Sequence, residues 1–209
     1  MKSSYIKILD VLSKDKRMQK IIQQTPPERI FNQNHDGQLM KDLISSIISQ
    51  QLSTKVARVI LHRFLELFGG EFPVSTDLLK TDHETLRSCG LSNQKAQYIR
   101  NIAEHFNTHR LKDEMFHDLS DEEIIESLTA IKGVGRWTVE MVLIFSLGRE
   151  DVFAVDDYGI QTALVEIYRL KEEKKALKLK MEQISQRWKP YRSTACLYLW
   201  AYKDLKLKI

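Results

Sequence analysis

The sequence predicts an all-α protein, and three observations support this prediction. Apolar residues recur at three- and four-residue spacing over long stretches, which is typical of helices that bury one face. No segment shows the sustained alternation of a β-strand. Only four prolines and eight glycines occur in 209 residues, so few helices would be interrupted. An apolar fraction of 43% is ordinary for a folded globular chain.

The clearest helical pattern lies between residues 39 and 67. Its apolar positions are Leu39, Leu43, Ile44, Ile47 and Ile48, followed by Val56, Val59, Ile60, Phe64 and Leu67. Two helices fit this pattern, with a break near Gln50–Ser53. Further along, Ser92, Ser120 and Asp121 are typical helix N-cap residues.

A short glycine-containing segment, Lys132-Gly133-Val134-Gly135, separates two further apolar stretches. Leu128 and Ile131 precede it, and Trp137, Met141 and Val142 follow it. This pattern predicts two short helices that pack across a tight turn. Glycine permits positive φ and leaves backbone N–H groups accessible, and a helix N-terminus favours an anion such as a phosphate. An ordinary turn between packed helices explains the segment equally well.

Two adjacent aspartates, Asp156 and Asp157, precede a third apolar pattern. Ile160, Leu164 and Ile167 predict a helix that begins just after them, so one aspartate can serve as its N-cap. The other is then available for chemistry, because an anion held with limited water stabilises developing positive charge. A plain cap with a solvent-exposed neighbour is the simpler alternative.

Composition excludes several classes of protein. The longest apolar run, Ala195–Tyr202, has eight residues and is far shorter than the roughly 20 that a membrane helix needs. The first residues interleave charges with apolar side chains, unlike a secretion signal. We therefore expect no membrane association and a cytoplasmic location, nucleoid-associated in a bacterium, or a nuclear one in a eukaryote.

Cysteine and charge content limit the partners. Cys89 and Cys196 are the only cysteines, too few for a disulfide framework, a zinc site of four cysteines or an iron–sulfur cluster, and we expect both to be buried. The net charge of +4 permits nucleic acid as a partner without requiring it. The charged segment Arg169–Lys180 is explained by a solvated helix face, with a phosphate-binding patch as the alternative.

Two stretches, "LTAIKGVGRWT" and "DVFAVDDYGI", resemble the signature of the helix-hairpin-helix (HhH-GPD) superfamily of DNA glycosylases. The stretches "SIISQQLSTKVA", "LRSCGLSNQKAQYIRNIA" and "RWKPYRSTACLYLW" extend the resemblance over roughly residues 35 to 202, closest to the DNA-3-methyladenine glycosylase II type. The resemblance implies two helical lobes with the active-site cleft between them, without an iron–sulfur cluster or an N-terminal β domain. It implies one domain over residues 1–209, with a middle lobe of about 38–155 that contains the hairpin at 128–138, and a second lobe of about 1–37 and 156–209.

In this family the aspartate twenty residues after the aromatic residue of the hairpin is catalytic, and counting from Trp137 gives Asp157. Asp156 is then a helix cap or a positioning neighbour. The resemblance implies base flipping, with Gln51 as the wedge residue beside Leu52. Trp137, Tyr158 and Trp200 become candidate walls of the base pocket, because aromatic faces attract a cationic purine. Each of these positions could instead serve the core, and for Trp188 we expect that role.

The resemblance also predicts the contacts with duplex DNA and an ion. We expect the hairpin to bind DNA through Lys132, Gly133, Val134, Gly135, Arg136 and Thr138. Backbone carbonyls of Thr129, Ile131 and Val134 would hold a Na⁺ or K⁺ ion, and no cofactor would be required.

The implied activity is that of a monomeric, monofunctional glycosylase acting on alkylated bases in double-stranded DNA. Bifunctional members carry a lysine at the position of Trp137, where it forms a Schiff base with the sugar. Two alternatives remain open, a helix-hairpin-helix protein that binds DNA without chemistry and a glycosylase with lyase activity that uses another lysine.

Overall fold

The computed structural model describes residues 2–31 and 37–208. These residues form helices and contain no strand, which confirms the predicted all-α class. None of the described helices is long and apolar enough to span a membrane. The helices are α1 (Lys2–Leu12), α2 (Lys16–Gln24), α3 (Glu28–Phe31), α4 (Leu39–Ser49), α5 (Thr54–Glu66), α6 (Ser75–Lys80), α7 (His83–Ser88), α8 (Asn93–Thr108), η1 (Asp113–Phe116), α9 (Asp121–Thr129), α10 (Arg136–Phe145), α11 (Tyr158–Tyr168), α12 (Lys174–Ser185), η2 (Gln186–Trp188) and α13 (Arg192–Asp204).

The chain divides into two compact units. The middle unit comprises residues 36–142, and the terminal unit combines residues 1–35 with residues 143–209. The boundary at 142/143 falls inside α10. Each unit has its own buried core and is described separately.

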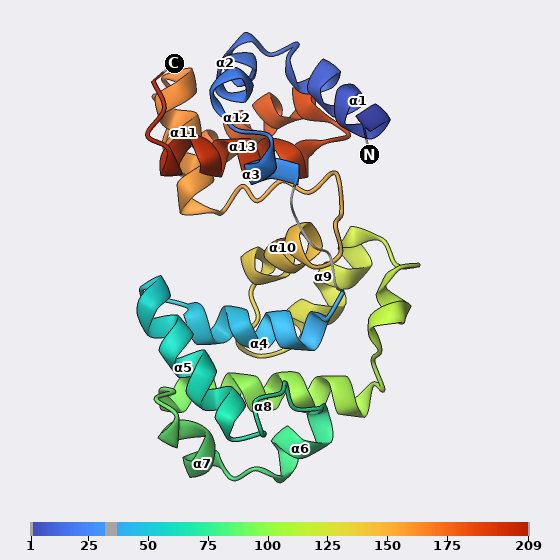
Figure 1. Cartoon of the computed structure of the whole chain (residues 1–209). Helices are drawn as coiled ribbons and strands as arrows, with labels where there is room; N and C mark the ends of the chain where they lie inside the picture. The colour runs from blue at the N-terminus through green and yellow to red at the C-terminus, as the bar shows by residue number, and fades with distance from the viewer. Residues whose placement is uncertain (1, 32–36, 209) are drawn as a thin grey trace. The chain divides into compact units, whose positions relative to one another are not determined.

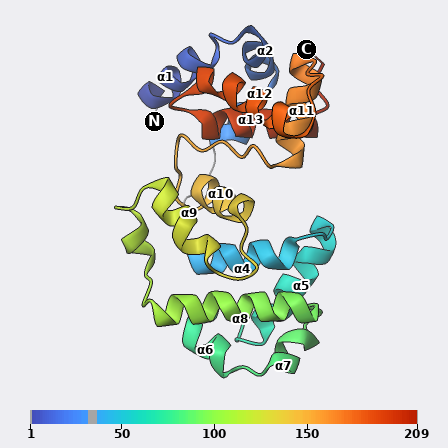
Figure 2. The ribbon, with the colours of Figure 1, turned by 180° about the vertical axis from the view of Figure 1, so that it is seen from behind.

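Helix α8 is the central element of the middle unit. It packs against α4, α6 and α7, and Figures 1 and 2 show α4 and α8 side by side. Ala96, Ile99, Ile102 and Phe106 recur at helical spacing on its buried face. Ser92 caps the helix, since its hydroxyl accepts a hydrogen bond from the backbone N–H of Lys95.

The predicted break between the first two helices of this unit is confirmed. Helix α4 ends at Ser49 and α5 begins at Thr54, where Ser53 is the N-cap. At the start of α9 the prediction was partly wrong, because Ser120 is the cap and Asp121 is the first helical residue. Ser120 and Glu123 form a capping box, which satisfies two backbone N–H groups at once.

The predicted helical hairpin consists of α9 and α10, and its loop depends on Gly133. This residue has φ of 106°, and a Cβ added there would lie 2.2 Å from the ring of Tyr98 on α8. Asn101, also on α8, donates a hydrogen bond to the carbonyl of Lys132 at 2.9 Å. Gly135 has no positive φ and no atom within 4 Å of an added Cβ. Only the first of the two glycines is therefore required by backbone geometry and close packing.

Helix α13 is the central element of the terminal unit. It packs against α11, α2, α3 and η2. Trp188 is fully buried, as predicted, and Cys89 and Cys196 are also buried, each in its own unit. Asp15, the N-cap of α2, also accepts a hydrogen bond from the buried hydroxyl of Tyr168. Burial is the main cause that raises the pKa of the Tyr168 hydroxyl, and the hydrogen bond to Asp15 raises it further.

The unequal environments of the two hairpin glycines give a matched test. Gly133→Ala should lower the free energy of unfolding by at least about 1 kcal/mol, because alanine would be strained at positive φ and would collide with Tyr98. Gly135→Ala should change it by less than about 0.5 kcal/mol. Urea denaturation of both variants measures the difference, and equal losses would contradict this account of the hairpin.

Candidate active site

Asp157 lies at the N-terminus of α11 and is its N-cap. Its backbone is extended, with φ of −71° and ψ of 125°, and its Oδ1 accepts a hydrogen bond from the backbone N–H of Ile160 at 2.8 Å. This geometry corrects the expectation that Asp156 caps the helix. Asp157 immediately precedes the first helical residue, so its side chain is the one that reaches the free N–H groups of the first turn.

A second donor reaches the same carboxylate oxygen from another helix. Trp200 on α13 donates its indole N–H to Asp157 Oδ1 at 2.9 Å. The ring of Trp200 in turn stacks on Phe145, with centroids 5.5 Å apart and an interplanar angle of 28°. Two N–H groups on packed helices therefore fix the position of one half-buried carboxylate, which is the preorganisation that charge stabilisation requires.

Gly159 is a site residue that sequence reasoning missed. A Cβ added there would lie 3.1 Å from Asp157 Oδ1 and 3.2 Å from Cδ1 of Trp200. The absence of a side chain thus allows the indole and the carboxylate to meet beside the backbone. The available signal was a glycine in the first turn of a predicted helix, where its low helix propensity calls for a packing reason.

Asp156 has a different environment from its neighbour. It forms an ion pair with Lys178 of α12, and both side chains are about half exposed. Lys178 belongs to the charged segment that was expected to be a solvated helix face. The cap role of Asp156 is excluded by the geometry of Asp157, whereas its role as a positioning neighbour stays a prediction.

The three candidate aromatic residues are distributed over both units. Trp200 is in direct contact with Asp157, and Tyr158 follows Asp157 in the chain with 80% of its surface exposed. Trp137 is in the middle unit, at the start of α10, and is 37% exposed. Exposed ring faces can stack on an extruded base, so Tyr158 and Trp137 remain candidates for that role.

The hairpin residues that were predicted to contact DNA have different environments. Lys132 is exposed, but Arg136 pairs with Glu122 and Glu140, each at 3.1 Å. The hydrogen bond with Glu122 is the main reason that the pKa of Arg136 is raised. Val134 and Thr138 are 5% and 2% exposed. The backbone N–H of Val134 is donated to the carbonyl of Ile131 at 3.0 Å, so a phosphate contact at these two buried positions stays a prediction.

The predicted ion site consists of backbone carbonyls at the hairpin. The carbonyl of Ile131 accepts a hydrogen bond from the N–H of Val134 at 3.0 Å. A carbonyl oxygen has two lone pairs, so this bond is compatible with an ion, and the ligands Thr129, Ile131 and Val134 stay a prediction. Among the described residues there is no group of three or more His, Cys, Asp or Glu side chains that could hold a metal.

The predicted wedge residues occupy the turn between α4 and α5. Gln51 and Leu52 are both exposed, and Leu52 retains 37% of its accessible surface. Gln51 has φ of 58°, the left-handed region that residues other than glycine rarely adopt. An unusual backbone conformation thus coincides with the position expected to enter the DNA.

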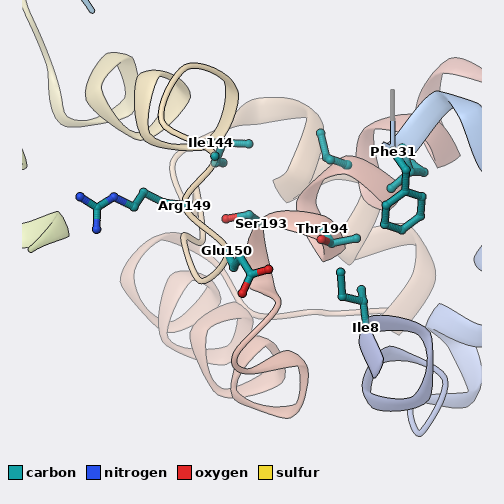
Figure 3. Close-up of a pocket in the computed structure, with 10 residues that line it drawn as sticks. Ile8, Phe31, Ile144, Arg149, Glu150, Ser193 and Thr194 are labelled. Atoms are coloured by element: carbon teal, nitrogen blue, oxygen red, sulfur yellow. The ribbon is translucent and has the colours of Figure 1, made fainter. Parts of the chain in front are cut away.

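The terminal unit also contains a small pocket. Its volume is about 170 Å³, and Figure 3 shows Glu150, Ser193 and Thr194 near its centre with Arg149 directed away. Ile8, Ile30 and Phe31 contribute apolar surface. None of the predicted site residues lines it, so we do not assign the base pocket to this hollow.

Comparison with known proteins identifies the family. The model of the HhH-GPD superfamily of base excision DNA repair proteins matches residues 44–190. DNA-3-methyladenine glycosylase 1 of Schizosaccharomyces pombe is 38% identical over 193 residues, which cover 91% of this chain and 82% of that protein. A solved S. pombe 3-methyladenine DNA glycosylase, in complex with abasic DNA, superposes with a TM-score of 0.81 at 35% identity, covering 96% of this chain and 97% of that one.

A second solved structure, a DNA-3-methyladenine glycosidase from Bacillus halodurans, gives a TM-score of 0.78 at 34% identity and covers 93% of this chain and 88% of that one. The all-helical fold agrees with these matches. This chain belongs to the HhH-GPD superfamily of base excision DNA repair proteins.

Proposed function

We propose that this protein is a monofunctional DNA glycosylase that hydrolyses the N-glycosidic bond of alkylated purines such as 3-methyladenine. The observation that carries the proposal is the Asp157 carboxylate, whose Oδ1 is fixed by the N–H groups of Ile160 and Trp200. Relatives named for 3-methyladenine support the substrate class. Both units would act together as one glycosylase domain.

The chemistry follows from the charge of the substrate. A purine alkylated at N3 or N7 is cationic, so it leaves the sugar as a neutral base without a general acid. The deoxyribose then carries the developing positive charge. Asp157, as an anion, would stabilise this charge and orient or deprotonate the water that adds to the sugar carbon. Water is the only co-reactant of this hydrolysis, so no cofactor is required.

Duplex DNA is the partner that this chemistry needs. The target nucleotide must leave the stack before its glycosidic bond becomes accessible. Backbone N–H groups of the hairpin, together with Lys132, would bind phosphates irrespective of sequence, and a Na⁺ or K⁺ ion on the hairpin carbonyls would add to this contact. Gln51 and Leu52 would fill the gap, and Tyr158, Trp137 and Trp200 would contact the cationic base. We expect the protein to act as a monomer.

Two alternatives are separated from this proposal by simple assays. A DNA-binding protein without chemistry would release no free base from alkylated DNA. A glycosylase with lyase activity would form an adduct that borohydride traps, and Trp137 stands where bifunctional members carry the attacking lysine.

Replacing Asp157 by asparagine tests the catalytic assignment. The amide oxygen of the new side chain would still accept both hydrogen bonds, so the fold and DNA affinity should be retained while the negative charge is lost. We expect base excision to fall by about a hundred- to a thousandfold under single-turnover conditions. Asp156→Asn is the matched control and should lose much less. A larger loss at Asp156 than at Asp157 would shift the catalytic assignment by one residue.

The Trp200 contact gives a second test of the same site. Trp200→Phe keeps an aromatic ring on Phe145 but removes the N–H that holds Asp157 Oδ1. A hydrogen bond to a charged group contributes about 1.5 kcal/mol or more, so single-turnover excision should fall about tenfold while affinity for undamaged duplex stays constant. An unchanged excision rate would mean that the indole does not position the carboxylate.

The wedge assignment is tested by Gln51→Ala on two substrates. Opening a stably paired lesion costs a few kcal/mol, and a mismatched lesion costs less. The variant should therefore be slowed most on the paired lesion, with non-specific affinity retained because phosphate contacts supply it. Single-turnover excision is measured on both duplexes, and equal slowing would exclude Gln51 as the wedge.

A further inference from the structure

The turn that carries Gln51 has an unusual conformation for its sequence. The backbone N–H of Leu52 donates to the carbonyl of Ser49 at 3.1 Å, which closes a four-residue turn. Gln50 has φ of −50° and ψ of 131°, and Gln51 has φ of 58°. These angles are those of a type II turn, in which the third position normally requires glycine or asparagine. Glutamine at that position is strained, so another contact must hold the turn in this form.

Lys95 supplies that contact from the first turn of α8. Its Nζ donates to the carbonyl of Gln50 at 2.7 Å and to the carbonyl of Ile48 at 2.9 Å. Both carbonyls lie at the C-terminus of α4, where the helix dipole favours a cation. The side chain is partly buried, and this desolvation lowers the pKa of Lys95. A lysine committed to two backbone carbonyls is not arranged as a free surface charge.

The position of the Gln50 carbonyl distinguishes the two common turn types. Type I and type II turns differ by a rotation of the peptide unit between the second and third residues, which here carries the Gln50 carbonyl. A type I turn would direct this oxygen away from Lys95 and would bring Gln51 to negative φ. The hydrogen bond from Lys95 to Gln50 therefore favours the type II form and, with it, the left-handed conformation of Gln51.

We propose that Lys95 is a positioning residue for base flipping, which holds the turn so that Gln51 projects in the orientation needed to fill the gap in the duplex. The inference rests on the proposed glycosylase function and adds a residue to it. Helix α8 has a parallel role at the hairpin, where Tyr98 packs under Gly133 and Asn101 binds the carbonyl of Lys132. One helix thus supports both segments expected to contact DNA.

The experiment compares Lys95→Met with Gln51→Ala and with the double variant. Methionine keeps much of the length of the side chain but donates no hydrogen bond. Single-turnover excision, with enzyme in excess, is measured on a defined alkylated purine that is stably paired and on the same lesion opposite a mismatch. We expect the ratio of paired to mismatched rates to fall about tenfold in each single variant, with no further fall in the double variant. An unchanged ratio in Lys95→Met overturns the proposal.

Lys80→Met is the matched control for charge. Lys80 is an exposed lysine at the end of α6 in the same unit, so its replacement removes one positive charge without touching the turn. The ratio of paired to mismatched excision rates in Lys80→Met should equal that of the wild type. The salt dependence of binding to undamaged duplex separates the roles further. If Lys95 contacted a phosphate, its replacement by methionine would reduce the slope of log affinity against log salt by about 1. Such a reduction, with equal slowing on both substrates, overturns the positioning role.

Two features keep the outcome interpretable. Both substrates are assayed with the same preparation, so a partly unfolded variant alters the two excision rates by the same factor. The variant Lys95→Arg retains the charge and the hydrogen-bond donors, and it should restore most of the ratio of paired to mismatched rates. Failure of the wild type to release base overturns the glycosylase function and this inference together. If the wild type releases the base and Lys95→Met has the same ratio of paired to mismatched excision rates as the wild type, only the role of Lys95 is overturned.

Discussion

The candidate site depends on one contact, the hydrogen bond from the Trp200 indole to Asp157 Oδ1. It exists because α11 and α13 pack together and because Gly159 leaves space for the two groups to meet. The same oxygen accepts the N–H of Ile160, so the candidate catalytic carboxylate is also a structural cap. A carboxylate that already has fixed donors needs little reorganisation when positive charge develops on the sugar.

In the middle unit, side chains of one helix hold backbone segments in place, much as two N–H groups hold the Asp157 carboxylate in the terminal unit. Helix α8 contributes Lys95 to the turn before α5 and contributes Tyr98 and Asn101 to the hairpin loop. Both supported segments leave regular helical geometry, at Gln51 and at Gly133. A rigid helix with a buried apolar face can hold such irregular segments in place, because its side chains are themselves fixed by packing.

The protein has only a small excess of positive charge, and two of its basic side chains near the predicted site residues are paired with carboxylates. The hairpin arginine, Arg136, is paired with two glutamates, and Lys178 is paired with Asp156. The net charge of +4 is a modest excess of cations for a chain of this length. Because binding through many phosphate contacts is strongly salt-dependent, the paired state of these two cations limits how much they can add to such binding.

The sequence by itself determined the helices and their buried faces. Periodicity located α4 and α5 with the break between them, and Trp188 was correctly expected in the core, because these features depend on local spacing and apolar burial. The order of motifs was enough to indicate the family. Tertiary structure alone decided which of two adjacent aspartates caps α11, since both positions satisfy the local pattern. It also brought Trp200 to Asp157 and Lys95 to Gln50, contacts across 43 and 45 residues that only the packing of helices can create.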